Sequence, residues 1–156
     1  MPPEKTVELA GFALAHAAWS VCVGETLIPM ALVDNGGDNR LIRIEGPAEK
    51  SVPLARQRLL DMKPTPDRWI LVYDGISNRG GHRQDCLVVQ PWDHSRSTLV
   101  RIVQEYDAKK PGQEFRIRIA PSLIDKDGHE IGTPELRTWL KKGVMKHDKA
   151  APLFHE

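Results

Sequence analysis

The chain has 156 residues, of which 40% are hydrophobic and 28% charged, and its formal net charge is +1. This length and balance predict one folded domain with a single core, and they differ from the low hydrophobicity and high charge of an intrinsically disordered chain. Because the net charge stays small along the whole chain, we expect neither nucleic acid nor an anionic membrane as a partner.

The first predicted element is a helix over residues 4–22. Pro3 precedes it and Gly24 follows it, which is the usual punctuation of a helix. Its apolar residues recur at helical spacing and include Val7, Ala10, Leu14, Ala17 and Val21. Since much of its circumference is apolar, we expect this helix to pack on a sheet.

A β-hairpin is predicted next, from two alternating runs at 26–33 and 40–45 around a turn rich in Gly, Asn and Asp. Pro29 lies inside the first run and has no N–H to donate, so we expect that strand to be an edge strand or to carry a bulge. Ser51 is then predicted to cap a second helix, which ends before Pro64. The apolar stripe of this helix is Val52, Ala55, Leu59 and Met62.

Four apolar or alternating runs follow at 69–76, 86–90, 98–106 and 114–120. Their connections are short, whereas a parallel crossover needs a dozen residues or more. The runs therefore predict an antiparallel meander. A small additional hairpin is expected over 122–131.

A short last helix is predicted to begin at Thr133 and Pro134, as N-cap and first helical residue, and to stop at Gly143. Its apolar residues are Leu136, Trp139 and Leu140. These side chains must be buried against this domain or against a second copy of the chain. Residues 1–143 are thus expected to form one domain, and 144–156, which are polar and aperiodic, a loose tail.

The two cysteines, Cys22 and Cys86, both lie in apolar patterns and are expected to be free thiols packed as small hydrophobes. The chain begins without the basic and apolar segments of a leader peptide. No run approaches the ~20 apolar residues of a membrane span. These features predict a soluble, cytoplasmic protein.

The element order predicts an α+β domain, with an antiparallel meander sheet of five to six strands packed with two longer helices and one short C-terminal helix. The order resembles that of profilin-like and Roadblock domains, which implies a sheet between helices. The stretches 11–30 and 73–105, which contain GETLIPMALV, YDG and RQDCLVVQ, are similar to a family of small uncharacterised bacterial proteins. That resemblance implies no activity and no functional residue.

The densest polar cluster lies at the predicted hairpin tip between 74 and 85. His82 and Arg83 are candidate contacts there for a small ligand, in a sensor domain with its pocket between helix and sheet. A plainer interpretation is that the glycines and Asn78 supply the backbone conformations of the loop and that the charged residues solvate it. Both interpretations stay open.

Asp85 and Glu105 stand on neighbouring predicted strands, as do the two acids of a divalent-metal-dependent phosphodiesterase or related hydrolase. Such a site also needs a Lys two positions beyond the second acid. This chain has Asp107 there, and Lys109 is the nearest substitute. If Asp85 faces the core instead, Arg83 is its expected partner.

No metal ion or cofactor is expected. The six histidines never fall three to five residues apart, so zinc spacing is missing. The turn 125–128 fails as a calcium loop, because Leu123 and Pro134 occupy the positions of the first ligand and of the bidentate glutamate. His16 is expected to be a hydrogen-bonded histidine at the edge of the core.

Trp92 lies in a predicted loop, 91–97, and either anchors a partner or covers one end of the core. The leading hypothesis is a non-catalytic protein-interaction module, forming a homodimer or binding another protein through Trp92 and the last helix. The hydrolase and the small-ligand sensor are the competing hypotheses.

Overall fold

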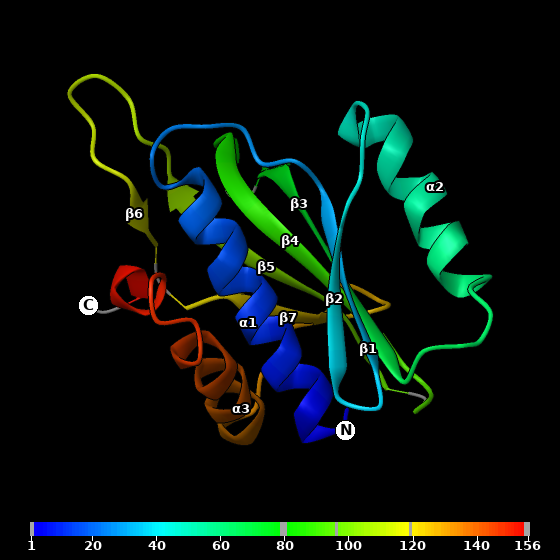
Figure 1. Ribbon diagram of the computed structural model, residues 1–156. Helices are drawn as coiled ribbons and strands as arrows, with labels where there is room; N and C mark the ends of the chain where they lie inside the picture. Colours follow the sequence, from blue (N-terminus) through cyan, green and yellow to red (C-terminus); the bar gives the residue numbers. More distant parts are fainter. Residues whose placement is uncertain (1, 79–80, 96, 119, 155–156) are drawn as a thin grey trace.

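The computed structural model describes residues 2–78, 81–95, 97–118 and 120–154 (Figure 1). Within them the strands form one antiparallel sheet in the order β2-β1-β3-β4-β5-β6, and β7 also pairs with β5. The elements are α1 (Glu4–Val21), β1 (Met30–Asn35), β2 (Asp38–Arg43), α2 (Ala48–Leu60), β3 (Arg68–Ser77), β4 (Gln84–Asp93), β5 (Leu99–Asp107), β6 (Arg116–Ile117), β7 (Ser122–Asp125), α3 (Pro134–Met145) and the 3-10 turn η2 (Ala151–Phe154). The predicted α+β class with a meander sheet is confirmed.

The two faces of the sheet carry separate helices (Figure 1). Strand β3 shows the division, because its side chains alternate between the faces. Ile70 and Val72 pack with α1 and α3 in the larger core cluster. Trp69 and Leu71 pack with α2 in a smaller cluster. The sheet therefore has two unequal cores, and both have their centre on β3 and its neighbours.

The contact between α1 and α3 depends on two glycines. A Cβ atom at Gly143 would lie 1.8 Å from the carbonyl oxygen of Glu8, and one at Gly11 would lie 2.1 Å from that of Leu140. No side chain fits there, so the backbones approach closely. The predicted helix stop at Gly143 is wrong: α3 continues to Met145, and the glycine serves packing inside the helix.

The position of the first hairpin also differs from the prediction. Strand β1 begins at Met30, directly after Pro29, and pairs with both β2 and β3. It is therefore an inner strand, and β2 is the edge. Pro29 is tolerated because it precedes the ladder, where its carbonyl oxygen accepts the N–H of Ile44 at 2.7 Å.

Helix α2 begins earlier than predicted. It starts at Ala48 with Pro47 at the N-cap position, so Ser51 lies inside the helix and is not its cap. The Ser51 hydroxyl is instead 3.4 Å from the carbonyl oxygen of Gly46 and can donate to it. The predicted apolar stripe is confirmed, since its members all belong to the cluster beneath α2.

The predicted strand at 114–120 is reduced to the two residues of β6. Strand β7 occupies the outer edge of β5 from Leu99 to Val103, whereas β6 pairs with Tyr106 and Asp107 and is followed by a backbone hydrogen bond from Arg118 to Glu105. Ile119 lies outside the described residues. Strand β6 is therefore confined between the end of β5 at Asp107 and the part of the β5 edge that β7 occupies.

The C-terminal segment is packed, which contradicts the predicted loose tail. Leu136, Leu140 and Val144 of α3 are buried, so the last helix covers its own domain. Beyond it, Ala150 is fully buried, and the end of η2 packs against the same cluster. The tail packs because its few apolar residues meet the small residues of α1.

Both cysteines are free, as predicted, and Cys86 is buried while Cys22 is half-buried. Among the described residues, no helix combines the length and the apolar character needed to cross a bilayer.

Candidate binding cavity at the Trp69–Trp92 pair

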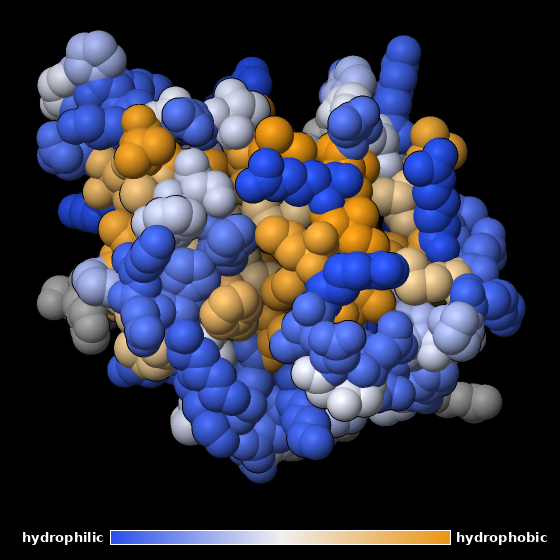
Figure 2. All heavy atoms as spheres, in the orientation of Figure 1, coloured by the Kyte–Doolittle hydropathy of each residue, from blue (hydrophilic) through white to orange (hydrophobic). Residues whose placement is uncertain are grey.

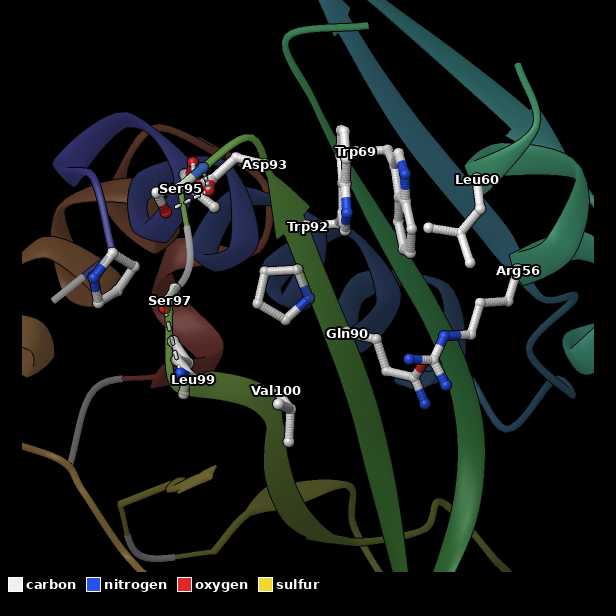
Figure 3. A pocket seen from close by; sticks show the side chains of 13 residues that line it. Arg56, Leu60, Trp69, Gln90, Trp92, Asp93, Ser95, Ser97, Leu99 and Val100 are labelled. Atoms are coloured by element: carbon white, nitrogen blue, oxygen red, sulfur yellow. Dashed lines mark hydrogen bonds between the residues drawn. The ribbon is translucent and has the colours of Figure 1, made fainter. Parts of the chain in front are cut away.

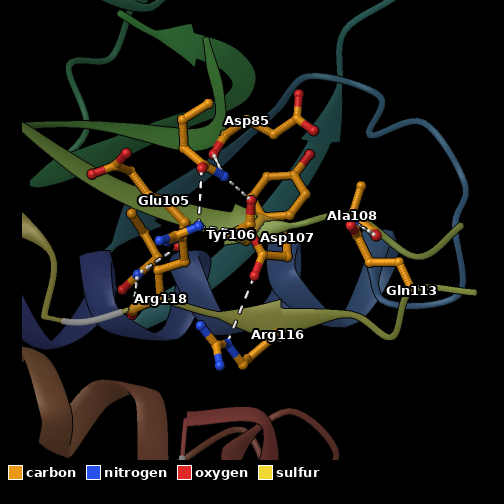
Figure 4. Close-up of polar contacts among 10 residues, drawn as sticks. Asp85, Glu105, Tyr106, Asp107, Ala108, Gln113, Arg116 and Arg118 are labelled. Carbon is orange, nitrogen blue, oxygen red and sulfur yellow. Dashed lines mark hydrogen bonds and ion pairs between the residues drawn. The ribbon is translucent and has the colours of Figure 1, made fainter. Parts of the chain in front are cut away.

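The structure separates Asp85 from Glu105. Cys86 lies directly opposite Glu105 in the β4–β5 pair, and directly paired residues project from the same face of a sheet. Asp85 precedes Cys86 and therefore projects from the other face. The two side chains lie apart in Figure 4. This contradicts the predicted carboxylate pair, because one metal ion cannot bind acids on both sides of a sheet.

Asp85 shares the α1 side of the sheet with Asp74 and Tyr106. The Tyr106 hydroxyl donates to Asp74 Oδ1 at 2.8 Å. Burial raises the pKa of Asp74, and the charge of Asp85 raises it further. Arg83 is exposed, and no ion pair joins it to Asp85 in the described ranges. These acids belong to the end of the core and line none of the cavities described below.

Asp107 has a structural role. Its carboxylate accepts from Arg118 Nη1 at 3.1 Å, and the same nitrogen donates to Gln84 Oε1 at 3.2 Å. Gln84 in turn donates to the carbonyl oxygen of Tyr106 (Figure 4). The network connects β4, β5 and the segment of β6, where only two residue pairs join the strands.

His82 and Arg83 are both exposed, at the tip of the β3–β4 hairpin. Trp92 lies at the opposite end of the same hairpin, since Ser77 pairs with Gln84 whereas Trp69 pairs with Trp92. Eight residues separate the two ends, which is about 26 Å at ~3.3 Å per residue. The structure therefore does not bring the predicted contact residues together.

Trp92 itself lies in β4 and not in a loop as predicted. Its ring stacks on that of Trp69, with centroids 5.9 Å apart and planes inclined by 8°. The ring of His94 meets it edge-on at 4.9 Å. Trp69 is 2% exposed, whereas Trp92 is half-buried and keeps part of its surface open.

A cavity of about 160 Å³ lies beside this tryptophan pair. Strands β4 and β5 are paired only between 86–89 and 102–105. Beyond Val89 they separate, and the cavity occupies the gap (Figure 3). One wall is formed by Trp69, Trp92 and Leu60, and the other by polar residues of the β4–β5 connection.

The aromatic wall contains two buried polar atoms without a partner among the described residues: the indole nitrogen Nε1 of Trp69 and the amide oxygen Oε1 of Gln90. Both residues line the cavity. The amide nitrogen of Gln90 donates to the Tyr73 hydroxyl at 2.8 Å, which orients the amide. Each of these two cavity-lining residues therefore contains one buried polar atom without a hydrogen bond.

The opposite wall contains several hydrogen bonds. Asp93 accepts from the hydroxyl of Thr6 and from the N–H of Ser95, the latter at 2.8 Å. Arg68 Nε donates to the Thr6 hydroxyl at 3.1 Å. These bonds hold the N-terminus of α1 against the ends of β3 and β4. The Thr6 hydroxyl and the Asp93 carboxylate therefore already have hydrogen-bond partners within the protein.

Two cations flank the aromatic wall. Arg56 of α2 lines the cavity, and its guanidinium lies beside Gln90 in Figure 3. Val103 of β5 pairs with Val88, so Arg101, two residues before it, projects from the face that carries Tyr73 and Gln90. Burial raises the pKa of Tyr73, whereas the charges of Arg101 and Arg56 lower it.

A second surface lies between α1 and the β1–β2 hairpin, where Figure 2 shows apolar side chains gathered in a shallow groove. Its exposed apolar residues include Trp19, Ile28 and Leu41. Arg43 lines a pocket on this surface together with Trp19 and Ile28. Nothing in the structure indicates what covers this groove.

One cluster near the turn after β7 contains Asp125, Asp127 and His129 within 4.8 Å of one another. Asp125 Oδ1 accepts the backbone N–H groups of Asp127 and His129, both at 2.9 Å. This turn geometry explains the cluster without a metal ion.

Comparisons with protein-family models, with curated proteins and with solved structures find no match to this chain. The geometry of its residues therefore carries the functional argument. The sequence interpretation found Trp92 but missed Trp69, Gln90 and Arg56. The available signal was the register of the hairpin. Trp69 precedes Ser77 by as many residues as Trp92 follows Gln84, so the two tryptophans face each other when Ser77 pairs with Gln84.

Proposed function

We propose that this protein is a non-catalytic interaction module that binds one side chain of a partner protein in the cavity beside Trp92. The observation that carries the proposal is that Trp69 and Gln90 both line the cavity and that each contains a buried polar atom without a hydrogen bond, Nε1 and Oε1 respectively. A buried polar group without a hydrogen bond costs about 1–3 kcal/mol. A partner group that supplies one acceptor and one donor would recover that energy.

The size of the cavity favours a side chain over a whole metabolite. Small-molecule sites usually measure about 300–1,000 Å³, and this cavity measures about 160 Å³. A cavity of roughly 150 Å³ is enough for one benzene ring. The part of the Trp92 indole that Trp69 and His94 leave uncovered offers such a ring a contact surface. The small-ligand sensor is therefore the weaker interpretation.

A metal-dependent hydrolase and a homodimer have less support. The hydrolase loses its motivation because Asp85 and Glu105 face opposite sides of the sheet. A homodimer through the last helix is also weaker, since α3 buries Leu136, Leu140 and Val144 in its own domain and leaves only Trp139 of its predicted apolar residues half-buried. The free thiols Cys22 and Cys86 agree with a reducing, cytoplasmic location.

The proposal is tested with N-acetylphenylalaninamide, a neutral probe that offers one ring together with backbone donors and acceptors. We expect it to shift the indole N–H signal of Trp69 in a ¹H–¹⁵N NMR titration at millimolar concentrations. Trp92→Ala should abolish the shift, because it removes the contact surface. Gln90→Leu should weaken binding while the protein stays folded, since Leu keeps most of the volume.

The matched control is Trp19→Ala, which removes a tryptophan from the groove beside α1 and should leave the titration unchanged. Shifts that are absent at all probe concentrations would overturn the proposal. Shifts that persist in both Trp92→Ala and Gln90→Leu would overturn it as well, because the probe would then bind elsewhere.

A further inference from the structure

We propose that the partner segment is an acidic peptide with one aromatic residue, held with its ring beside Trp92 and its carboxylates on Arg56 and Arg101. This inference rests on the proposed function and names the chemistry that the same site selects. It adds a charge requirement that the cavity alone does not impose.

The arrangement of the two arginines supports an anionic partner. Arg101 directly precedes Ile102, the first residue of β5 that pairs with β4, and therefore lies next to the point where the two strands separate. Arg56 approaches Gln90 from α2 (Figure 3). The charges of both arginines act on Tyr73, which accepts a hydrogen bond from Gln90. Within the described part of the chain, neither forms an ion pair or a side-chain hydrogen bond.

Among the described arginines, Arg40, Arg43, Arg58 and Arg83 also lack a protein partner, so the position near Gln90 is what distinguishes Arg56 and Arg101. Arg68 is paired with Asp34, Arg118 with Asp107 and Arg137 with Glu130. A guanidinium matches a carboxylate in bidentate geometry. A partner carboxylate would thus find two unpaired cations, Arg56 in the lining of the cavity and Arg101 on the same face of the sheet.

A peptide satisfies the whole site, whereas a bare aromatic acid satisfies part of it. Its backbone N–H can donate to Gln90 Oε1, and its carbonyl oxygen can accept from Trp69 Nε1. Its ring covers Trp92 and the exposed edge of Leu60, which is 43% exposed. Acidic residues on both sides of the ring then reach Arg56 and Arg101. Nucleic acid fits less well, because two cations on a chain of net charge +1 are too few for a phosphate backbone.

The test uses three capped pentapeptides with a central phenylalanine, flanked on both sides by glutamate, by glutamine or by lysine. Binding is followed through the Trp69 indole signal at about 50 mM salt, where the Debye length exceeds 10 Å. We expect the glutamate peptide to bind at least about tenfold more tightly than the glutamine peptide, and the lysine peptide to bind most weakly. Raising the salt should reduce this preference.

Substitutions of the two arginines test whether these residues cause the preference for the glutamate peptide. Arg56→Gln and Arg101→Gln should each reduce the glutamate preference about threefold, and the double variant should remove it. Arg83→Gln is the control, because it changes the net charge equally but lies at the far end of the hairpin. Its preference should equal that of the native protein.

The outcomes separate the two proposals. If the glutamine and glutamate peptides bind equally, or if Arg83→Gln lowers the preference as much as Arg56→Gln does, the acidic partner is wrong and the interaction module stands. If no peptide shifts the Trp69 signal, both are wrong.

Discussion

Arg68 and Asp34 form an ion pair across the β1–β3 register, at the end of the sheet where α1 begins. Asp34 is 6% exposed, and Arg68 also pairs in register with Asp93 on its other side. Thr6 of α1 connects Arg68 to Asp93, since its hydroxyl accepts from Arg68 and donates to Asp93. Three strands and one helix thus meet in a single polar row.

We predict that Arg68→Ala destabilises the protein by about 3 kcal/mol, because it leaves the buried Asp34 carboxylate without its cation. Urea unfolding followed by circular dichroism measures this loss. Arg83→Ala, at an exposed position, should change the free energy of unfolding by less than about 0.5 kcal/mol. Equal effects of the two substitutions would show that the row contributes no specific stability.

Gly143→Ala is predicted to cost about 3 kcal/mol or to prevent folding, because the new methyl group would overlap the Glu8 backbone. Thermal unfolding measures the effect. Gly132→Ala provides the comparison: its methyl group would meet only the side-chain ends of Glu130 and Arg137, which can move. A Gly143→Ala protein as stable as Gly132→Ala would contradict the close helix contact.

The stability of the protein should decrease as the pH falls below about 6.5, the ordinary pKa of histidine. His147 Nδ1 accepts the N–H of Ala150 at 3.1 Å. Its Nε2 therefore carries the proton and donates to His16 Nδ1, 3.0 Å away. Burial lowers the pKa of His16, and the neighbouring charges of His147 and Arg43 lower it further. The unfolded chain thus binds more protons in this pH range than the folded one.

Urea unfolding between pH 5 and pH 8 tests this dependence. His16→Gln cannot titrate, so its free energy of unfolding should fall less steeply toward pH 5 than that of the native protein. His82→Gln removes an exposed histidine and should keep the native slope. The His16 assignment is contradicted if His16→Gln keeps the native slope as well.

Cys86 should resist alkylation in the folded protein. Burial raises the pKa of its thiol to about 11, together with the charges of Asp74, Glu105 and Asp85. At pH 8 only about one thiol in a thousand is then ionised. Mass spectrometry after iodoacetamide treatment should find Cys22 modified first and Cys86 unmodified, with both modified in urea. Early modification of Cys86 would show that β4 opens readily.

Local signals in the sequence predicted several elements well. The apolar period and flanking residues placed α1 to within one residue. Thr133 and Pro134 correctly marked the start of α3, where the Thr133 hydroxyl accepts the N–H of Leu136 at 3.2 Å. The meander followed from short connections. Each of these signals acts between residues close in the chain, where backbone geometry and side-chain period fix the outcome.

Errors arose where distant segments meet. Gly143 resembles a helix stop in sequence, but contact with α1 gives it a packing role. The tail from Val144 resembles a loose end, but Ala150 finds a site against α1. The contact between His16 and His147 likewise could not be predicted from their positions in the sequence. Such contacts depend on helix position, which sequence periodicity does not encode.

The sequence by itself thus determined the class of the fold, the alternation of each strand and the residue types available for binding. Only the tertiary structure decided which of them share a site. The β4–β5 register pairs Glu105 with Cys86, so Asp85, one residue earlier, projects from the opposite face. The β3–β4 register pairs Trp69 with Trp92. The separation of β4 from β5 then opened the cavity beside them. The physical reason is that strand side chains alternate every residue, so a site on a sheet depends on how its strands pair.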